Sequence, residues 1–486
     1  MTPGKLARRS PSPAASDARA AKRRKLEYPP LTPDDYRNGV MLAPMVRSGA
    51  LPTRLFALKH GAKLVWGPEI VDKAILHAER VVDPATGVVS YMGVSKAIWT
   101  THPIEKPFLI YQIGSADPDL AVQAAKKVMN DVSGIDLNCG CPKPFSTHAG
   151  MGAALLSNPD LLCAILTALR QNLPPEISVS AKIRLLPTQE DTLKLVERIV
   201  NTGVNCLTVH CRTRSMRPRE RALVERLEEI VKFVKSLGKD VAVIENGDCV
   251  SYEDAKRIRK MTGADSCMIA TAAEANPTVF SAHPYTDLET TFIPSYVRLG
   301  KYLNNHWSST KFCASQFRGE HSKGNRASQT AMKNAITHAK GYDDLEELVG
   351  PWTGEQVFAE IVEAIEARNG DRQPKIDETA PAPANSPVAA AAAVEATTVT
   401  PAEPAQAAEQ ENSPAMSEGA ESATLSTASS QDTQDLKTPV QSHSPDPALL
   451  RAPLAPANES RMPVPSLVSG EDVPTPTPSQ LPAEAA

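Results

Sequence analysis

The stretch that decides the fold is GIDLNCGCPK, residues 134–143, in which an apolar run ends at the polar Asn138 and leads into a turn that carries a second cysteine. Seven further apolar runs of similar length lie between residues 40 and 272, and helical patterns separate them. Runs that are apolar on both faces are typical of parallel strands covered on both sides. The seven runs are VMLAPM (40–45), KLVWG (63–67), FLIYQIG (108–114), SVSAKIR (178–184), CLTVHCR (206–212), VAVIENG (241–247) and SCMIATA (266–272).

The alternation of these runs with helices predicts the fold class. Eight strand–helix repeats over about 240 residues have the size and rhythm of a (β/α)8 TIM barrel, an α/β fold. Two helix starts support this prediction, because Asn158-Pro159 precedes LLCAILTAL, and Ser251 with Asp254 precedes AKRIRKM. A doubly wound open sheet is the alternative, but it more often has a glycine-rich first turn, which this sequence lacks.

Composition divides the chain around this barrel, which we expect over residues 37–285, after a disordered basic arm at 1–36. Residues 286–370 carry the patterns SYVRLGKYLNNHW, ASQTAMKNAITHAK and GEQVFAEIVEAIEARN, which predict a small all-helical domain. Residues 371–486 are mostly Ala, Pro, Ser, Thr, Glu and Gln and cannot bury enough apolar area to fold, so a disordered tail is expected. Residues 71–107 are too long for one crossover helix and are expected to place a loop or hairpin over the barrel mouth.

Charge is distributed unevenly along the chain. The tail holds 16 acidic and 5 basic residues, a net charge of -11, so the overall -4 leaves +7 for residues 1–370. A cationic folded part permits a polyanionic partner such as a nucleic acid. An ordinary basic surface explains the same charge equally well.

The eight cysteines form no CxxC pair, so neither a metal site nor a disulfide framework is indicated. The sequence has no apolar run of membrane-spanning length and no signal peptide, and we expect an intracellular protein without a membrane partner. Arg8-Arg9 and the cluster at 22–25 have the spacing of a bipartite signal read by a nuclear import receptor. A solvated arm or an extra RNA contact is the open alternative, and location in nucleus and cytoplasm is the expectation.

Five of the apolar runs end in a polar residue. The carboxyl ends of barrel strands form the active-site face, so these side chains should converge on one ligand. A planar, amide-rich flavin suits them, and the turn Asn246-Gly247-Asp248 with the segment 270–273 occupies the usual phosphate position of the fold. A sugar phosphate would fit that turn as well. The five residues are Gln112, Asn138, Lys182, His210 and Asn246.

The run NCGCPK places Cys141 at the start of a loop above the barrel, close to Lys143. An exposed thiol beside a cation can act as a proton donor or a nucleophile, whereas a structural cysteine is the alternative. We expect the pKa of this thiol to be lowered somewhat by Lys143 or His148.

The motifs LAPMVR (42–47), YQIGS (111–115), DLNCGCPK, AKIR (181–184), VHCR (209–212) and ENGD (245–248) together resemble the tRNA-dihydrouridine synthases. The resemblance covers about residues 38–350 and is greatest to the eukaryotic type that modifies position 20 of the D-loop. It implies an FMN barrel reduced by NADPH or NADH, a tRNA substrate and a monomer. An FMN barrel acting on a free pyrimidine, such as a dihydroorotate dehydrogenase, and a tRNA-binding chaperone are the rival functions.

The resemblance also implies roles for single residues. Cys141 matches the catalytic acid of the family, and Cys139 stands at a variable position. Thr271 stands where many relatives have Arg, which leaves phosphate binding more to the backbone, and His148 where close ones have Lys. The FMN-binding residues would be Pro44, Met45, Gln112, Asn138, Lys182, His210, Asn246, Gly247, Ala270 and Thr271; the candidates for RNA contact are Lys143, Arg184, Lys311, Arg318, Lys323 and Arg326.

Overall fold

The computed structural model describes residues 28–217, 219–319, 326–350, 353–368 and 372. The basic clusters of the arm and nearly all of the acidic tail lie outside these residues, so the import signal and the disorder of both ends stay predictions. Within the described residues, no helix is both long and apolar enough to cross a membrane.

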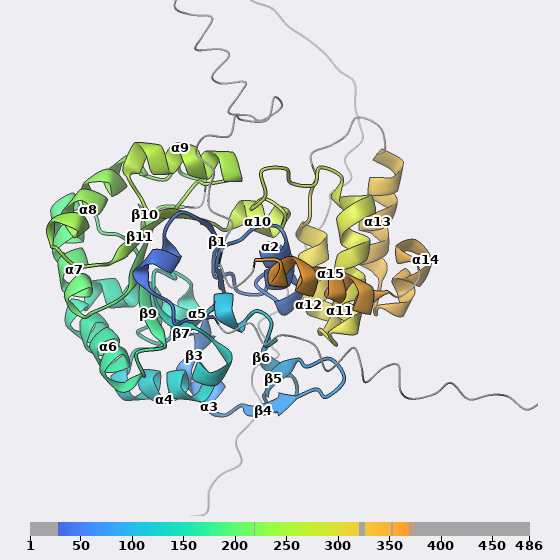
Figure 1. Cartoon of the computed structure of the whole chain (residues 1–486), viewed down its shortest axis with the longest axis horizontal. Helices are drawn as coiled ribbons and strands as arrows, with labels where there is room; N and C mark the ends of the chain where they lie inside the picture. Colours follow the sequence, from blue (N-terminus) through green and yellow to red (C-terminus); the bar gives the residue numbers. More distant parts are fainter. Residues whose placement is uncertain (1–27, 218, 320–325, 351–352, 369–371, 373–486) are drawn as a thin grey trace, which may run out of the picture. The chain divides into compact units, whose positions relative to one another are not determined.

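Eight parallel strands of the described chain close into a barrel (Figure 1). The ring closes because β2 pairs with both β1 and β7, and β1 pairs with β12. The predicted barrel is therefore confirmed, and the open sheet is wrong. The strands are β1 (Val40–Leu42), β2 (Val65–Trp66), β7 (Leu109–Gly114), β8 (Gly134–Cys139), β9 (Ser178–Leu185), β10 (Cys206–Thr213), β11 (Ala242–Asn246) and β12 (Ser266–Ile269).

Helices cover the outside of the barrel, and both predicted helix starts are confirmed. The side chain of Asn158 accepts from the Leu161 N–H at the start of α6, and that of Ser251 accepts from the Asp254 N–H at the start of α9. These caps satisfy backbone donors that the first helical turn leaves without partners. The outer helices are α2 (Leu51–Lys59), α4 (Pro118–Val128), α6 (Pro159–Asn172), α7 (Gln189–Asn201), α8 (Glu225–Ser236), α9 (Tyr252–Thr262) and α10 (Thr271–Ala275).

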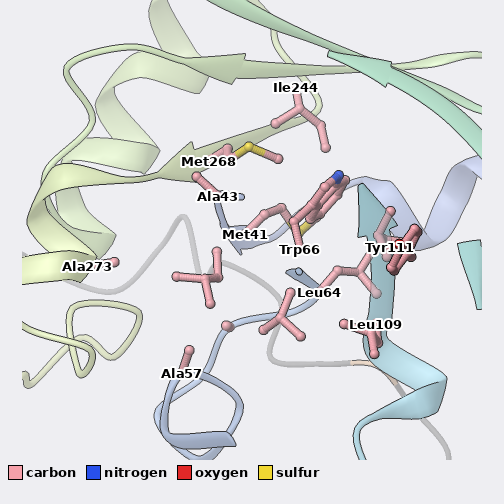
Figure 2. Packing of buried hydrophobic residues seen from close by; sticks show 14 of the residues in the cluster. Met41, Ala43, Ala57, Leu64, Trp66, Leu109, Tyr111, Ile244, Met268 and Ala273 are labelled. Atoms are coloured by element: carbon pink, nitrogen blue, oxygen red, sulfur yellow. The ribbon is translucent and has the colours of Figure 1, made fainter. Parts of the chain in front are cut away.

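The barrel interior is apolar in its middle and closed at the amino-terminal ends of the strands. Figure 2 shows Met41, Trp66, Ile244 and Met268 packed in this core. Below them, the short helix η1 (Pro33–Tyr36) closes the barrel, because the Tyr36 hydroxyl lies 2.7 Å from Ser178 Oγ. The predicted domain start at residue 37 is therefore wrong, since Tyr36 is fully buried.

The segment 71–107 forms a small antiparallel sheet and not a cover for the barrel mouth. The Arg80 guanidinium and the Tyr91 hydroxyl donate to Asp131, which lies just before the amino-terminal end of β8. Trp99 packs edge-on against Tyr111 at 4.9 Å. Large aromatic rings are stabilised when they are buried against other residues, and the side of the barrel provides this contact for Tyr91 and Trp99. The elements are β3 (Ile70–Val71), α3 (Asp72–Leu76), β4 (Glu79–Val82), β5 (Val89–Met92) and β6 (Ala97–Thr101).

Helices follow the barrel as predicted, but the first expected helix, over residues 295–307, ends early, and a helix that the sequence did not predict follows it. The chain turns at Asn304, which has a φ of +52°, and a new helix begins at Trp307. The fold also continues past the predicted end at residue 370, because the buried Arg372 donates to the Pro107 carbonyl and pairs with Asp35 at 2.9 Å. The helices are α11 (Ile293–Tyr302), α12 (Trp307–Gln316), α13 (Arg326–His338), α14 (Glu346–Val349) and α15 (Gly354–Glu366).

Candidate active site

The five predicted strand-end residues do meet at the carboxyl end of the barrel. Asn138 is paired in register with Lys182, and His210 with Asn246, so alternate positions of neighbouring strands face the same interior. Gln112 joins them through its amide, whose oxygen accepts from Asn138 Nδ2 at 3.3 Å. Gln112 in turn donates to the buried Asp136 at 2.8 Å.

Basic side chains dominate this mouth. Lys182 makes no ion pair with any residue in the described part of the chain, and burial, followed by the charge of Arg184, lowers the pKa of its amine to about 8. Burial also lowers the pKa of His210 to about 2, with Lys182, Arg184 and Arg212 adding to the shift. The mouth therefore holds a neutral imidazole next to an ammonium group that a bound anion would stabilise.

The expected phosphate position lies at the ends of β11 and β12. Asn246 Nδ2 donates to the Met268 carbonyl at 2.9 Å, which fixes the turn. A Cβ at Gly247 would lie 2.6 Å from Glu245 Oε1, so a larger residue would have to displace this buried side chain. Ala270 is partly exposed and Thr271 is exposed at the start of α10, which leaves backbone groups open to a ligand. A phosphate group fits this arrangement.

Pro44 and Met45 directly follow β1, and both are partly buried at the same end of the barrel. Met45 also packs against the hydrophobic core. An apolar edge of this kind suits one face of a planar ring, as the sequence predicted.

Cys141 lies on the loop that follows β8, and the backbone holds it in place. Asn138 Oδ1 accepts from the N–H groups of Gly140 and Cys141 at 2.9 and 3.0 Å. The Cys141 carbonyl accepts from the Ala153 N–H at 2.9 Å. The thiol is half-buried, so it is reachable from the mouth yet fixed in position.

The predicted direction of the Cys141 pKa shift is wrong. Burial, and next the charge of Glu69, raise the pKa of this thiol to about 11. Lys143 and His148, the expected cations, are both exposed to solvent, whereas Glu69 is only 7% exposed. Near neutral pH the group is therefore a thiol with a proton to give, and not a nucleophilic thiolate.

Three residues of the site were missed in the sequence. Glu69 follows β2, but Pro68 separates it from the apolar run that ends at Gly67, so it does not look like a strand-end residue. Asp136 lies inside its run and is fully buried, and burial raises its pKa to about 6. Arg212 stands within the VHCR motif, where its guanidinium pairs with Asp248. For Asp136 and Arg212, a charged residue inside an apolar run was the signal that could have identified them as site residues.

The residues predicted to contact RNA differ in their exposure to solvent. Arg184 is buried and donates to the carbonyls of Gly140 and Thr213, so it supports the Cys141 loop and is not available at the surface. Lys311 donates to the carbonyls of Thr337 and Ala339 at the end of α13. Arg318 and Lys143 are exposed, as surface contacts require. Lys323 lies outside the described residues, as does the side chain of Arg326.

One cluster bears on the prediction that the chain has no metal site. Ligand atoms of Glu245, Cys249 and Cys267, all buried, lie within 4.8 Å of one another. Both thiols, however, lie near backbone carbonyls, Cys249 at 3.7 Å from Ser251 O and Cys267 at 3.5 Å from Ala255 O. The cluster is therefore explained as core packing, although its geometry would also admit an ion.

Basic and amide groups meet at the carboxyl ends of the barrel strands, and the loop after β8 holds the Cys141 thiol at the same end. This arrangement defines an enzyme of the (β/α)8-barrel class. The sequence pattern of the dihydrouridine synthase (Dus) family matches residues 41–339. The chain belongs to this family.

The chain is also similar in sequence to individual members of this family from yeasts. A tRNA-dihydrouridine(20) synthase [NAD(P)+] of Schizosaccharomyces pombe is 47% identical over 319 residues, 64% of this chain and 64% of that protein. The Saccharomyces cerevisiae protein with the same description is 43% identical over 58% of this chain and 77% of its own length. A tRNA-dihydrouridine(20a/20b) synthase of S. cerevisiae is 29% identical over 49% of this chain and 61% of its own. The matched part thus spans just under two thirds of the S. pombe relative.

Proposed function

We propose that this chain reduces one uridine of the tRNA D-loop, at position 20, to 5,6-dihydrouridine. Its family and the descriptions of the S. pombe and S. cerevisiae tRNA-dihydrouridine(20) synthases support this assignment. The observation that carries it is the half-buried Cys141, held by Asn138 on its loop at the barrel mouth that contains Lys182. A protein that only bound tRNA would need neither group.

The residues at the mouth fit FMN as the cofactor. Lys182 supplies a cation without an ion-pair partner in the described chain, and the partly exposed Ala270 and exposed Thr271 leave backbone groups open to a phosphate. When bound, FMN would pass to the uracil a hydride received from NADPH or NADH. The residues that would hold it are Pro44, Met45, Gln112, Asn138, Lys182, His210, Asn246, Gly247, Ala270 and Thr271.

The protein's own groups then have distinct tasks. Lys182 offsets negative charge that accumulates in the mouth, and His210 stays neutral and serves as a hydrogen-bond partner. Hydride addition at carbon 6 of the uracil leaves negative charge on its carbonyl oxygen and carbon 5. Cys141 donates its Sγ proton to carbon 5, on the face opposite the hydride. The target base must leave the tRNA stack to reach it.

Surface contacts with tRNA belong to the same proposal. Lys143 lies on the loop that carries Cys141, Arg318 follows α12, and both are exposed, so both would neutralise phosphates of the bound tRNA. A monomer, present in nucleus and cytoplasm, is part of the proposal. The two basic clusters of the arm would bind the import receptor.

The test is a map of dihydrouridine across all tRNAs in cells that lack the gene. The proposal expects loss at D-loop position 20 alone and restoration by the wild-type gene. An unchanged map would refute it, and loss at another position would correct the assigned uridine.

A further inference from the structure

Glu69 is a buried acid that the proposed reaction does not yet use. It follows β2 and is 7% exposed. Its Oε1 accepts from Ser146 Oγ at 3.0 Å, and a Cβ at Gly114 would lie only 2.7 Å from the same oxygen. Its Oε2 has no hydrogen-bond partner in the described part of the chain. A buried carboxyl oxygen without a partner is costly, so its retention needs an explanation.

The contact with Ser146 ties Glu69 to the loop that carries the thiol. Ser146 lies on the short helix α5 (Pro144–Thr147), within this loop. The loop returns through Gly152, whose φ is +58° and where a Cβ would lie 2.7 Å from the Cys141 carbonyl. One carboxyl group, from the segment after β2, therefore anchors the loop that follows β8, two strands away in the barrel.

The same carboxyl group lies close enough to the Cys141 thiol for its negative charge to raise the pKa of that thiol. The other titratable groups around this thiol are Lys182 and Arg184, whose charges favour a thiolate, and the buried Cys139 behind Glu69. The negative charge of Glu69 thus counteracts the effect of the two positive charges, Lys182 and Arg184, on the thiol. Without it, the nearby charges would all be positive, only burial would still raise the pKa of the thiol, and the thiolate fraction would grow.

We propose that Glu69 is the positioning residue of the proton donor: its buried carboxyl group, anchored by Ser146, holds the Cys141 loop and keeps Cys141 in its thiol form. The consequence for proton donation rests on the proposed function, but the thiol form itself does not. In the resting enzyme a protonated sulfur resists alkylation and oxidation, because the thiolate is the reactive species.

The test is the alkylation rate of Cys141 by iodoacetamide from pH 6 to 11, followed by peptide mass spectrometry on the full-length holoenzyme. In the wild type the rate should rise only above about pH 10, past the ordinary thiol pKa of about 8.5. Glu69→Gln should alkylate at least about tenfold faster at pH 8, since one pKa unit changes the thiolate fraction tenfold. Glu69→Asp should restore much of the protection, and Glu79→Gln, at an exposed glutamate of β4, should match the wild type.

Three outcomes would overturn the proposal: a wild-type midpoint near pH 8.5, unchanged alkylation in Glu69→Gln, or equal alkylation in the Gln and Asp variants. If Glu69→Gln does not fold, as judged by thermal melting, Ser146→Ala decides in its place: it removes the anchor of the carboxyl group and should also speed the alkylation of Cys141 at pH 8. Dihydrouridine formation in one turnover by pre-reduced enzyme should lose its alkaline range in Glu69→Gln. A wild type that shows the high midpoint but never forms dihydrouridine would refute the proposed function and leave the role of Glu69 standing.

Discussion

Lys182 illustrates how burial prepares a single residue for a ligand. Its side chain reaches the barrel mouth among Arg184, Arg212 and His210, and burial holds its pKa at about 8. The charged form is therefore lost within an accessible pH range unless an anion is bound.

This gives a prediction for cofactor binding. The ammonium form exists below the pKa, so the affinity for FMN should be greatest below pH 8 and fall as the pH rises through that value. Lys182→Met should bind FMN about tenfold or more weakly at pH 7 and lose this pH dependence, as expected for removal of a charged hydrogen bond. Fluorescence titration of the apoprotein measures both effects. An unchanged affinity in Lys182→Met would show that the cation does not face the cofactor.

At the residue scale the sequence predicted which side chains meet, but not their charge states. The five strand-end residues converge because β-strand alternation and barrel closure are properties of the local pattern. The pKa of Cys141 was wrong because it depends on Glu69, which is 72 positions away in the chain. Lys143, its neighbour in sequence, points to solvent.

Among the elements, α2 and the small sheet β4–β6 are joined by a buried ion pair. Arg54 on α2 donates from Nε and Nη2 to Glu105 at 2.9 and 2.6 Å, and the two side chains are 1% and 0% exposed. The same guanidinium donates to the Thr100 carbonyl, in β6. This pair therefore fixes the segment 71–107 to the side of the barrel.

Removing one partner should destabilise the protein strongly. Glu105→Ala leaves the Arg54 charge buried without its partner, which should lower the free energy of unfolding by about 3–5 kcal/mol. Urea unfolding followed by circular dichroism gives this value. Lys59→Ala, which removes a partly exposed pair with Glu360, is the control and should cost at most about 1 kcal/mol. Equal effects of the two variants would contradict the assigned role of the buried pair.

The strands and outer helices could be predicted because each has a local signal, such as the Asn158 and Ser251 caps. The position of the segment 71–107 could not be predicted. Asp131 and Tyr111, which contact this segment from the barrel, give no sign of these contacts in the local sequence. The helix break at Asn304 also escaped, because a left-handed asparagine inside an amphipathic pattern looks like a helical residue.

For the whole molecule, composition predicted a folded part over residues 37–370, and the buried Tyr36 and Arg372 lie just outside it. It failed at both ends for the same reason: Tyr36 and Arg372 gain their burial from partners far away in sequence. Arg372 donates to Asp35, so the two ends of the described chain hold each other.

Truncation tests these limits. A chain that ends at Arg372 should keep the wild-type melting temperature and its activity on tRNA. A chain that ends at Arg368 loses the buried contacts of Arg372 with Asp35 and Pro107, and its free energy of unfolding should fall by about 1–3 kcal/mol. Differential scanning calorimetry distinguishes the two. Full activity in the first chain would also show that the acidic segment after residue 372 is not needed for catalysis, whereas a large loss would contradict this account.

The central claim is that Cys141 gives the proton that completes reduction of uridine. The most direct measurement is the yield of dihydrouridine in a single turnover, with pre-reduced enzyme and unmodified tRNA. Cys141→Ala should keep FMN, NADPH oxidation and tRNA binding, yet form dihydrouridine roughly two or more orders of magnitude more slowly, the usual effect of removing a general acid. Cys139→Ala, at a fully buried position, should react at nearly the wild-type rate. A wild-type yield and rate in Cys141→Ala would contradict the account and assign the proton to another group or to water.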